Sequence, residues 1–143
     1  MRPIYLLDTN IISEIRKSEP NALVMQKLAK NQRISAISAL AYDEMLFGVK
    51  RMTEGKKKEA LIEFYTEFVQ SNFEILPFDV HCSWIHSDLL ERLEKIGKPA
   101  PLIDSMIAAT AIANNMILVT RNVSDFENIR GLSNLMIENW FEK

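Results

Sequence analysis

Short apolar runs of strand length alternate with longer helix-like segments along this chain, and that alternation is what most restricts its fold. Five runs have strand character, at residues 4–7, 34–37, 74–78, 117–120 and 135–137. Between the first four, helical spacing of apolar residues predicts helices over 20–29, 40–52, 57–69, 80–96 and 102–114. Such alternation is typical of a mostly parallel sheet covered by helices. We therefore expect an α/β/α sandwich, with about five strands in a central, mostly parallel sheet.

Three local signals refine this expectation. Pro20 suits the first turn of a helix, and Gly97 followed by Pro99 is typical of a helix end. An amphipathic stripe at spacings of three and four should pack one helix onto the sheet; it consists of Leu61, Phe64, Tyr65 and Phe68. The segment 102–114 is apolar on nearly every face, so we expect it to be buried.

Composition indicates an ordinary globular protein. The 143 residues are 48% apolar and 25% charged, which fits a single domain spanning residues 1–143 with a real core. The single Cys82 excludes an internal disulfide and suggests a reducing compartment. The opening residues lack the apolar stretch of a signal peptide, and no run approaches the roughly 20 residues of a membrane span. We expect a cytoplasmic protein without membrane contact.

Four carboxylates lie close to the ends of these apolar runs or at the start of the most apolar helix: Asp8, Glu44, Asp104 and Asp125. Because the carboxyl ends of parallel strands line the ligand crevice of an open α/β sheet, these side chains should converge. Converging carboxylates repel one another unless a cation neutralises them. Oxygen ligands favour a hard divalent ion such as Mg²⁺ or Mn²⁺. The pattern therefore indicates metal-assisted chemistry on phosphate.

Each acid also has a purely structural explanation. Asp8 could cap a helix that begins after the first strand, and Asp125 could cap a polar turn. Asp104 could simply stabilise a helix N-terminus, although its alignment with an apolar face makes an unpaired carboxylate costly there. Glu44 and Asp43 have the same apolar neighbours at helical spacing, so periodicity does not choose between them. Near Asp125, Thr120 and Asn122 are candidates to hydrogen-bond a ligating carboxylate or a water.

Net charge is −2, which argues against a general nucleic-acid binder, but without the four site acids it becomes +2. Two basic stretches, 50–58 and 92–98, could hold a phosphate backbone, although solvated helix faces are the commoner explanation for either one. The aromatic stripe, with Met45 and Phe47, could serve a subunit interface.

Other chemistries fit poorly. His81 and His86 are five residues apart, which does not place them together as metal ligands on a helix, and Cys82 has no evident base. A phosphatase of the haloacid-dehalogenase type also begins with an apolar strand and an Asp. That chemistry needs a second Asp two residues later, where this chain has Asn10.

Four motifs together resemble the PIN-domain ribonucleases, specifically the VapC-type toxins close to the FitB-like and plasmid-stability members. An apolar strand followed by D-T-N occurs at 8–10, and I-S-x-x-T-x-x-E followed by Gly matches 37–48. D-x-x-I-A-A-x-A matches 104–111, and T-x-N-x-x-D-F matches 120–126. Under this resemblance Glu44, not Asp43, is the functional acid. Two departures stand out: Ala41 replaces the usual Thr, and Asp43 replaces a small residue.

The resemblance implies a compact α/β/α fold and an Mg²⁺- or Mn²⁺-dependent endoribonuclease whose metal is held by Asp8, Glu44, Asp104 and Asp125. It implies a homodimer and a VapB-like antitoxin that binds DNA itself, so that DNA contact is indirect. Close relatives of this kind cut structured RNA such as tRNA or ribosomal RNA. The alternative is a catalytically weak module of the same fold that holds RNA or a partner without cleavage; a small phosphatase is a more distant third hypothesis.

Overall fold

The computed structural model describes residues 2–143, and its centre is a sheet of five strands, all parallel. The strands are β1 (Tyr5–Leu7), β2 (Ser35–Ser38), β3 (Glu74–Leu76), β4 (Ile117–Val119) and β5 (Met136–Glu138). Their order across the sheet is β3-β2-β1-β4-β5. The register pairs Leu6 with Ala36 on one side and with Leu118 on the other. The expected α/β fold with a five-stranded sheet is confirmed.

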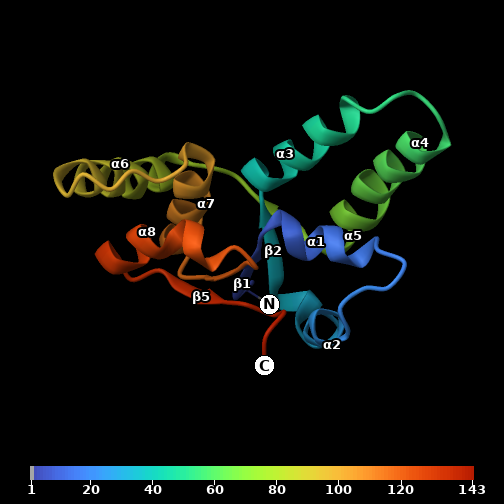
Figure 1. Ribbon diagram of the computed structural model, residues 1–143, viewed down its shortest axis with the longest axis horizontal. Helices are drawn as coiled ribbons and strands as arrows, with labels where there is room; N and C mark the ends of the chain where they lie inside the picture. The colour runs from blue at the N-terminus through green and yellow to red at the C-terminus, as the bar shows by residue number, and fades with distance from the viewer. Residues whose placement is uncertain (1) are drawn as a thin grey trace.

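Eight α-helices connect these strands: α1 (Thr9–Ile15), α2 (Ala22–Asn31), α3 (Ala39–Lys50), α4 (Lys56–Glu63), α5 (Gln70–Asn72), α6 (Val80–Lys95), α7 (Leu102–Ala113) and α8 (Glu127–Leu132). From β1 the chain steps through β2 to β3 in one direction, then returns past β1 to β4 and β5. Because parallel crossovers are right-handed, this reversal places α6, α7 and α8 on the opposite face from α1 to α5. Figure 1 shows these two groups of helices on either side of the sheet.

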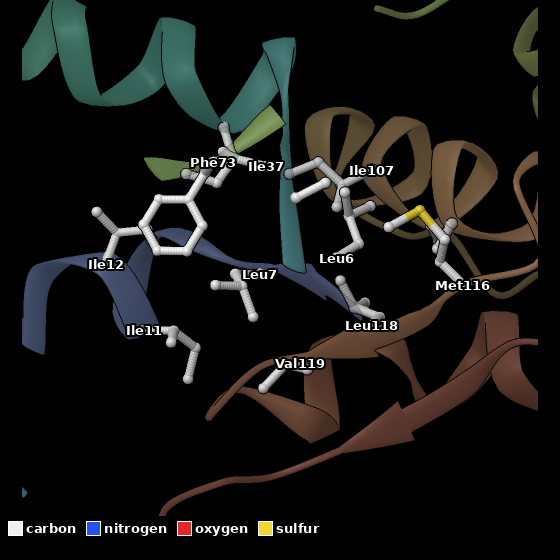
Figure 2. Close-up of a cluster of buried hydrophobic side chains, with 14 of the residues drawn as sticks. Leu6, Leu7, Ile11, Ile12, Ile37, Phe73, Ile107, Met116, Leu118 and Val119 are labelled. Atoms are coloured by element: carbon white, nitrogen blue, oxygen red, sulfur yellow. The ribbon is translucent and has the colours of Figure 1, made fainter. Parts of the chain in front are cut away.

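Buried apolar side chains cover both faces of the sheet. Leu6, Leu7, Leu118 and Val119 are essentially inaccessible to solvent. Since successive strand residues point to opposite faces, Leu6 lies toward Ile107 of α7 while Leu7 lies on the side of α1 (Figure 2). Burial on both sides explains why these strands are continuous apolar runs rather than alternating ones.

Several expected boundaries need correction. Pro20 lies outside α2, because the Asn21 side chain caps that helix by accepting hydrogen bonds from the N–H groups of Leu23 and Val24. The third strand stops at Leu76 instead of continuing to Phe78, since Pro77 has no N–H to donate to the sheet. The helix expected over 57–69 is α only to Glu63 and continues as a π-helix over Phe64–Val69.

Other expectations hold. Gly97 has φ 64° at the end of α6, where its N–H donates to the Glu94 carbonyl and that of Lys98 to the Leu93 carbonyl. Five consecutive residues of α7, Ile107–Ala111, are all buried. Cys82 is fully buried, as a core cysteine should be. Within residues 2–143, none of the helices combines the length and apolar character needed to cross a membrane.

One buried acid joins α1 to α2 and lies outside any candidate site. Glu14 is 4% exposed; its Oε2 accepts a hydrogen bond of 2.7 Å from the N–H of Asn21, and its Oε1 lies 2.9 Å from Lys17 Nζ. The hydrogen bond from Lys17, followed by that from Asn21, holds the pKa of Glu14 below its ordinary value. The carboxylate thus fixes the turn that leads into the Asn21 cap.

We predict that Glu14→Ala destabilises the protein by about 1–3 kcal/mol at neutral pH, because the Asn21 N–H loses its acceptor. Since the folded pKa of Glu14 is lowered, its contribution is complete above the unfolded pKa and disappears as pH falls through the folded pKa. Urea unfolding at pH 7 and near pH 3 should show the difference shrink in acid. Lys17→Ala should cost less, because the Lys17 side chain is 55% exposed; equal losses at both pH values would refute this role.

Candidate active site

The candidate site lies where the order of strands reverses, between β1 and β4. Asp8 follows β1 directly, and its N–H donates to the Val119 carbonyl at 2.9 Å. Thr120 follows β4, and its N–H donates to the Glu138 carbonyl at 3.1 Å. In an open parallel sheet this reversal leaves a crevice at the carboxyl ends of the strands. Asp8 and Thr120 therefore stand side by side at the place expected for a ligand.

Asp8 is 7% exposed and serves two purposes at once. Its Oδ1 accepts from the N–H of Thr9 at 2.9 Å, so it caps α1, which is the structural role the sequence also allowed. Its Oδ2 accepts from the Thr120 hydroxyl at 2.9 Å and from Asn10 Nδ2 at 3.4 Å. These contacts hold the carboxylate in one orientation at the edge of the sheet.

Asn10 is the residue that sequence reasoning missed, although it closes the D-T-N motif. Its Nδ2 also donates to Thr120 Oγ1 at 3.3 Å, and its Oδ1 accepts from the Arg121 N–H at 3.0 Å. Asn10 thus ties the start of α1 to the loop after β4. The signal available in the sequence was the Asn of the D-T-N motif, two residues after the acid, to which no role at the site was assigned.

The loop after β4 contributes less directly. Asn122 is exposed, and it is its backbone N–H, not its side chain, that donates to Thr120 Oγ1 at 3.1 Å. Asp125 is exposed within a 3-10 turn, Val123–Phe126, and its N–H donates to the Asn122 carbonyl. Asp125 acts on Asp104 through its charge, which raises the pKa of Asp104.

Asp104 lies in the first turn of α7 and is half-buried. Its pKa is raised to about 6, first by burial and then by the negative charges of Asp8, Asp125 and Glu44. The structure therefore brings the other three sequence-predicted acids within electrostatic range of Asp104. Every one of these influences raises the pKa of Asp104, so the negative charge at this site is not offset by the protein.

Glu44 extends from α3, and burial, followed by the charges of Asp8 and Asp43, raises its pKa. Glu44 acts on Asp104, whereas Asp43 does not appear among the charges that shift the pKa of Asp104. Asp43 acts instead on Glu44, whose pKa its charge helps to raise. Without a hydroxyl at Ala41, α3 still has a side-chain cap, because Ser38 Oγ accepts a hydrogen bond of 3.0 Å from the Ala41 N–H.

The donor set suits a hard divalent cation. Three carboxylates act on Asp104 through their charges, and none of the four forms an ion pair within residues 2–143. In that part of the chain, however, no three acid, imidazole or thiol groups lie close enough to enclose an ion directly. A hydrated ion fits this spacing better than a tight protein cage, because Mg²⁺ usually retains several waters and takes only one or two carboxylates. Asp8, Glu44, Asp104 and Asp125 are the residues that would hold it.

A pocket of about 270 Å³ adjoins the acids. Its polar side consists of Thr9, Ser13 and Glu44, and its apolar floor includes Met45, Val49 and Tyr65. A larger pocket of about 670 Å³ lies between α6 and α8, lined in part by Asp88 and Arg92. None of the four acids lines that larger pocket, so the smaller one is the opening that belongs to the candidate site.

Some side chains of each basic stretch form hydrogen bonds or ion pairs within the protein. Lys58 pairs with Glu54 and donates to the Lys50 carbonyl, and Arg92 donates to the Leu132 carbonyl. Arg51 lies over the ring of Phe47 at 4.7 Å, and Phe47 is 60% exposed beside Glu44 on α3. The cationic side chains closest in sequence to Glu44 therefore border the site without entering it.

Comparison with known proteins agrees with this architecture. The model of the PIN domain matches residues 5–132. The chain is 33% identical to ribonuclease VapC2 of Rickettsia felis, over 96% of this chain and 98% of the relative. It is 29% identical to the tRNA(fMet)-specific endonuclease VapC of Shigella flexneri, over 90% of this chain and 93% of the relative.

Two solved structures have the same fold. FitAcB from Neisseria gonorrhoeae superposes with a TM-score of 0.87 at 29% identity, covering 98% of this chain and all of that one. VapBC2 from Rickettsia felis, bound to a DNA fragment from its promoter, has a TM-score of 0.76 at 30% identity, covering 96% and 98%. The chain therefore belongs to the PIN-domain family, where its relatives include VapC ribonucleases.

Proposed function

We propose that this protein is a metal-dependent endoribonuclease and the toxin of a type II toxin–antitoxin pair. The observation that carries the proposal is the group of four carboxylates: burial, followed by the charges of Asp8, Asp125 and Glu44, raises the pKa of Asp104, and within residues 2–143 none of the four forms an ion pair. When bound, Mg²⁺ or Mn²⁺ would supply an activated water and would stabilise the charge that develops on phosphorus. Asp8, Glu44, Asp104 and Asp125 are its proposed ligands.

The protein's own groups have separate tasks in this proposal. Thr120 and Asn10 orient Asp8 through hydrogen bonds to its Oδ2. Asn122 supports Thr120 through its backbone N–H. Burial of Asp104 strengthens its interaction with a cation, because charges interact more strongly away from bulk water. The 270 Å³ pocket beside Glu44 lies open to solvent next to these groups and offers room for RNA at the phosphate to be cut.

The relatives suggest both substrate and partner. The endonuclease of Shigella flexneri is specific for tRNA(fMet), which supports structured RNA, such as tRNA or ribosomal RNA, as the substrate class here. The VapBC2 complex supports a VapB-like antitoxin as partner, with DNA contacted through that antitoxin. We also propose a homodimer in the cytoplasm. A short DNA-binding protein encoded next to this chain would support the toxin role.

The first prediction concerns catalysis. Asp104→Asn should reduce RNA cleavage by at least about 100-fold, because it removes a ligand charge while preserving side-chain volume. The assay is cleavage of total tRNA and ribosomal RNA at saturating Mg²⁺ or Mn²⁺. Asp88→Asn, an exposed acid on α6, is the matched control and should cut normally. Wild-type activity of Asp104→Asn would refute its assignment; RNA binding without cleavage by the unaltered protein would favour the binding-module alternative.

The second prediction concerns stability without RNA. Because the folded pKa of Asp104 lies above its ordinary 3.8, the metal-free protein loses stability as pH rises from about 4 through about 6. Metal-free Asp104→Asn should therefore be more stable than the parent at pH 7.5, by about 1–3 kcal/mol, and no more stable near pH 4. Mg²⁺ or Mn²⁺ should stabilise the parent by about 2.7 kcal/mol at 100 times its Kd. A melting temperature insensitive to both ions would contradict the metal site.

The third prediction separates two neighbouring acids on α3. Glu44→Gln should remove most of the cleavage activity, since it deletes a proposed ligand. Asp43→Asn should be mild or slightly activating, because it removes a like charge near the RNA phosphates while leaving the acid that acts on Asp104. Both variants should be assayed at saturating Mg²⁺. An inactive Asp43→Asn beside an active Glu44→Gln would show that the ligand is one residue away from the one proposed.

A further inference from the structure

The helix that carries Asp104 begins without a side-chain cap. Pro101 occupies the capping position of α7, and no side chain hydrogen-bonds to the free N–H groups there. The adjoining Leu102 is 60% exposed, so the outer side of this first turn has little packing. At the same time Asp8, Asp125 and Glu44 repel the Asp104 carboxylate. Something else has to keep this turn, and therefore Asp104, in place.

The inner side of the turn is anchored through Ser105, which is fully buried. Its hydroxyl donates to the Leu102 carbonyl at 2.7 Å, within the same turn. Nε2 of His86, on α6, lies 2.9 Å from the Ser105 hydroxyl oxygen. A hydroxyl has one hydrogen, and the carbonyl can only accept it. The arrangement that satisfies both contacts has the proton of His86 on Nε2, donating to Ser105 Oγ.

His86 is itself held in place. It is half-buried on α6, and Phe78 lies against it in a T-shaped arrangement, with ring centroids 5.8 Å apart and an interplanar angle of 83°. Burial lowers the pKa of His86 below its ordinary value and so favours the neutral ring, which has a proton on only one of its nitrogens. Phe78 lies two residues beyond β3, which links the ring to the sheet. A continuous series of contacts thus runs from the end of β3 to the first turn of α7.

We propose that His86 is a positioning residue for the metal site. Its hydrogen bond to Ser105 holds the uncapped first turn of α7, and so keeps Asp104 directed toward Asp8 and Glu44 against their mutual repulsion. His86 is not itself a proposed ligand, and its contact is with Ser105, the residue next to Asp104. The inference rests on the proposed function only in taking Asp104 as a ligand of a divalent ion.

Mn²⁺ binding to the RNA-free protein tests this role directly, by titration calorimetry at pH 7.5. His86→Ala should weaken binding roughly 3- to 10-fold, the loss expected for removing one buried hydrogen bond that supports a ligand. His86→Gln should restore it to within about twofold, because the Gln amide nitrogen reaches about as far as Nε2. His86→Asn should remain weak, since its shorter amide cannot reach Ser105. His81→Ala, at the exposed histidine of the same helix, should bind normally.

Two further measurements separate positioning from simple loss of stability. Melting temperatures identify any variant that fails to fold, and His86→Gln and His86→Asn are compared only as folded proteins. In the parent, nitrogen-15 NMR should show His86 as the neutral ring protonated at Nε2. Ser105→Ala should weaken Mn²⁺ binding similarly, and combining it with His86→Ala should add little further loss.

The outcomes are distinct. If the parent binds Mn²⁺ and His86→Ala binds it equally well, or if the ring carries its proton on Nδ1, the positioning role is wrong while the proposed nuclease stands. Equal weakening in His86→Gln and His86→Asn would also overturn it. If the parent binds no Mn²⁺, the metal proposal is wrong, and the positioning role of His86 is wrong as well.

Discussion

Mutual repulsion of carboxylates at one edge of the sheet is the constraint around which this protein is arranged. Asp8 is brought there by β1, Asp104 by α7, Glu44 by α3 and Asp125 by the loop after β4. Folding the chain forces these charges together, and the raised pKa of Asp104 records the free-energy cost. A fold built for stability alone would have no reason to collect them. Under the proposed function, a bound cation would offset this cost, because each carboxylate would then be attracted to the cation.

The surrounding structure holds these acids in place individually. Asp8 is fixed by Thr9, Thr120 and Asn10, so that it caps α1 and still faces the crevice. Ser38 caps α3 and sets the helix that carries Glu44. Asp104 lacks such a cap and depends on packing and hydrogen bonding from the opposite side, where Ser105 and His86 meet. Asp8, Glu44 and Asp104 are therefore secured by three different arrangements.

Local sequence signals were strong wherever local chemistry decided the outcome. All five strands were predicted, because each includes buried or half-buried apolar residues in a short run between helix-like segments. The helix end at Gly97 was predicted correctly, because glycine readily adopts the left-handed backbone that the structure shows there. Two predicted boundaries were wrong. Asn21 caps α2, so Pro20 lies before the helix and not in its first turn. The segment Phe64–Val69 forms a π-helix, which simple apolar periodicity does not indicate.

By itself, the sequence determined the α/β class, the five strands and the four acids placed near their ends, because these depend on local apolar patterning and on side-chain chemistry. The tertiary structure alone decided which acids influence one another, since Asp8 and Asp104 are separated by 96 positions and meet only through the strand order. It also decided the roles of Asn10 and His86. Their partners, Thr120 and Ser105, lie 110 and 19 positions away, and hydrogen bonds over such separations leave no periodic signal in the sequence.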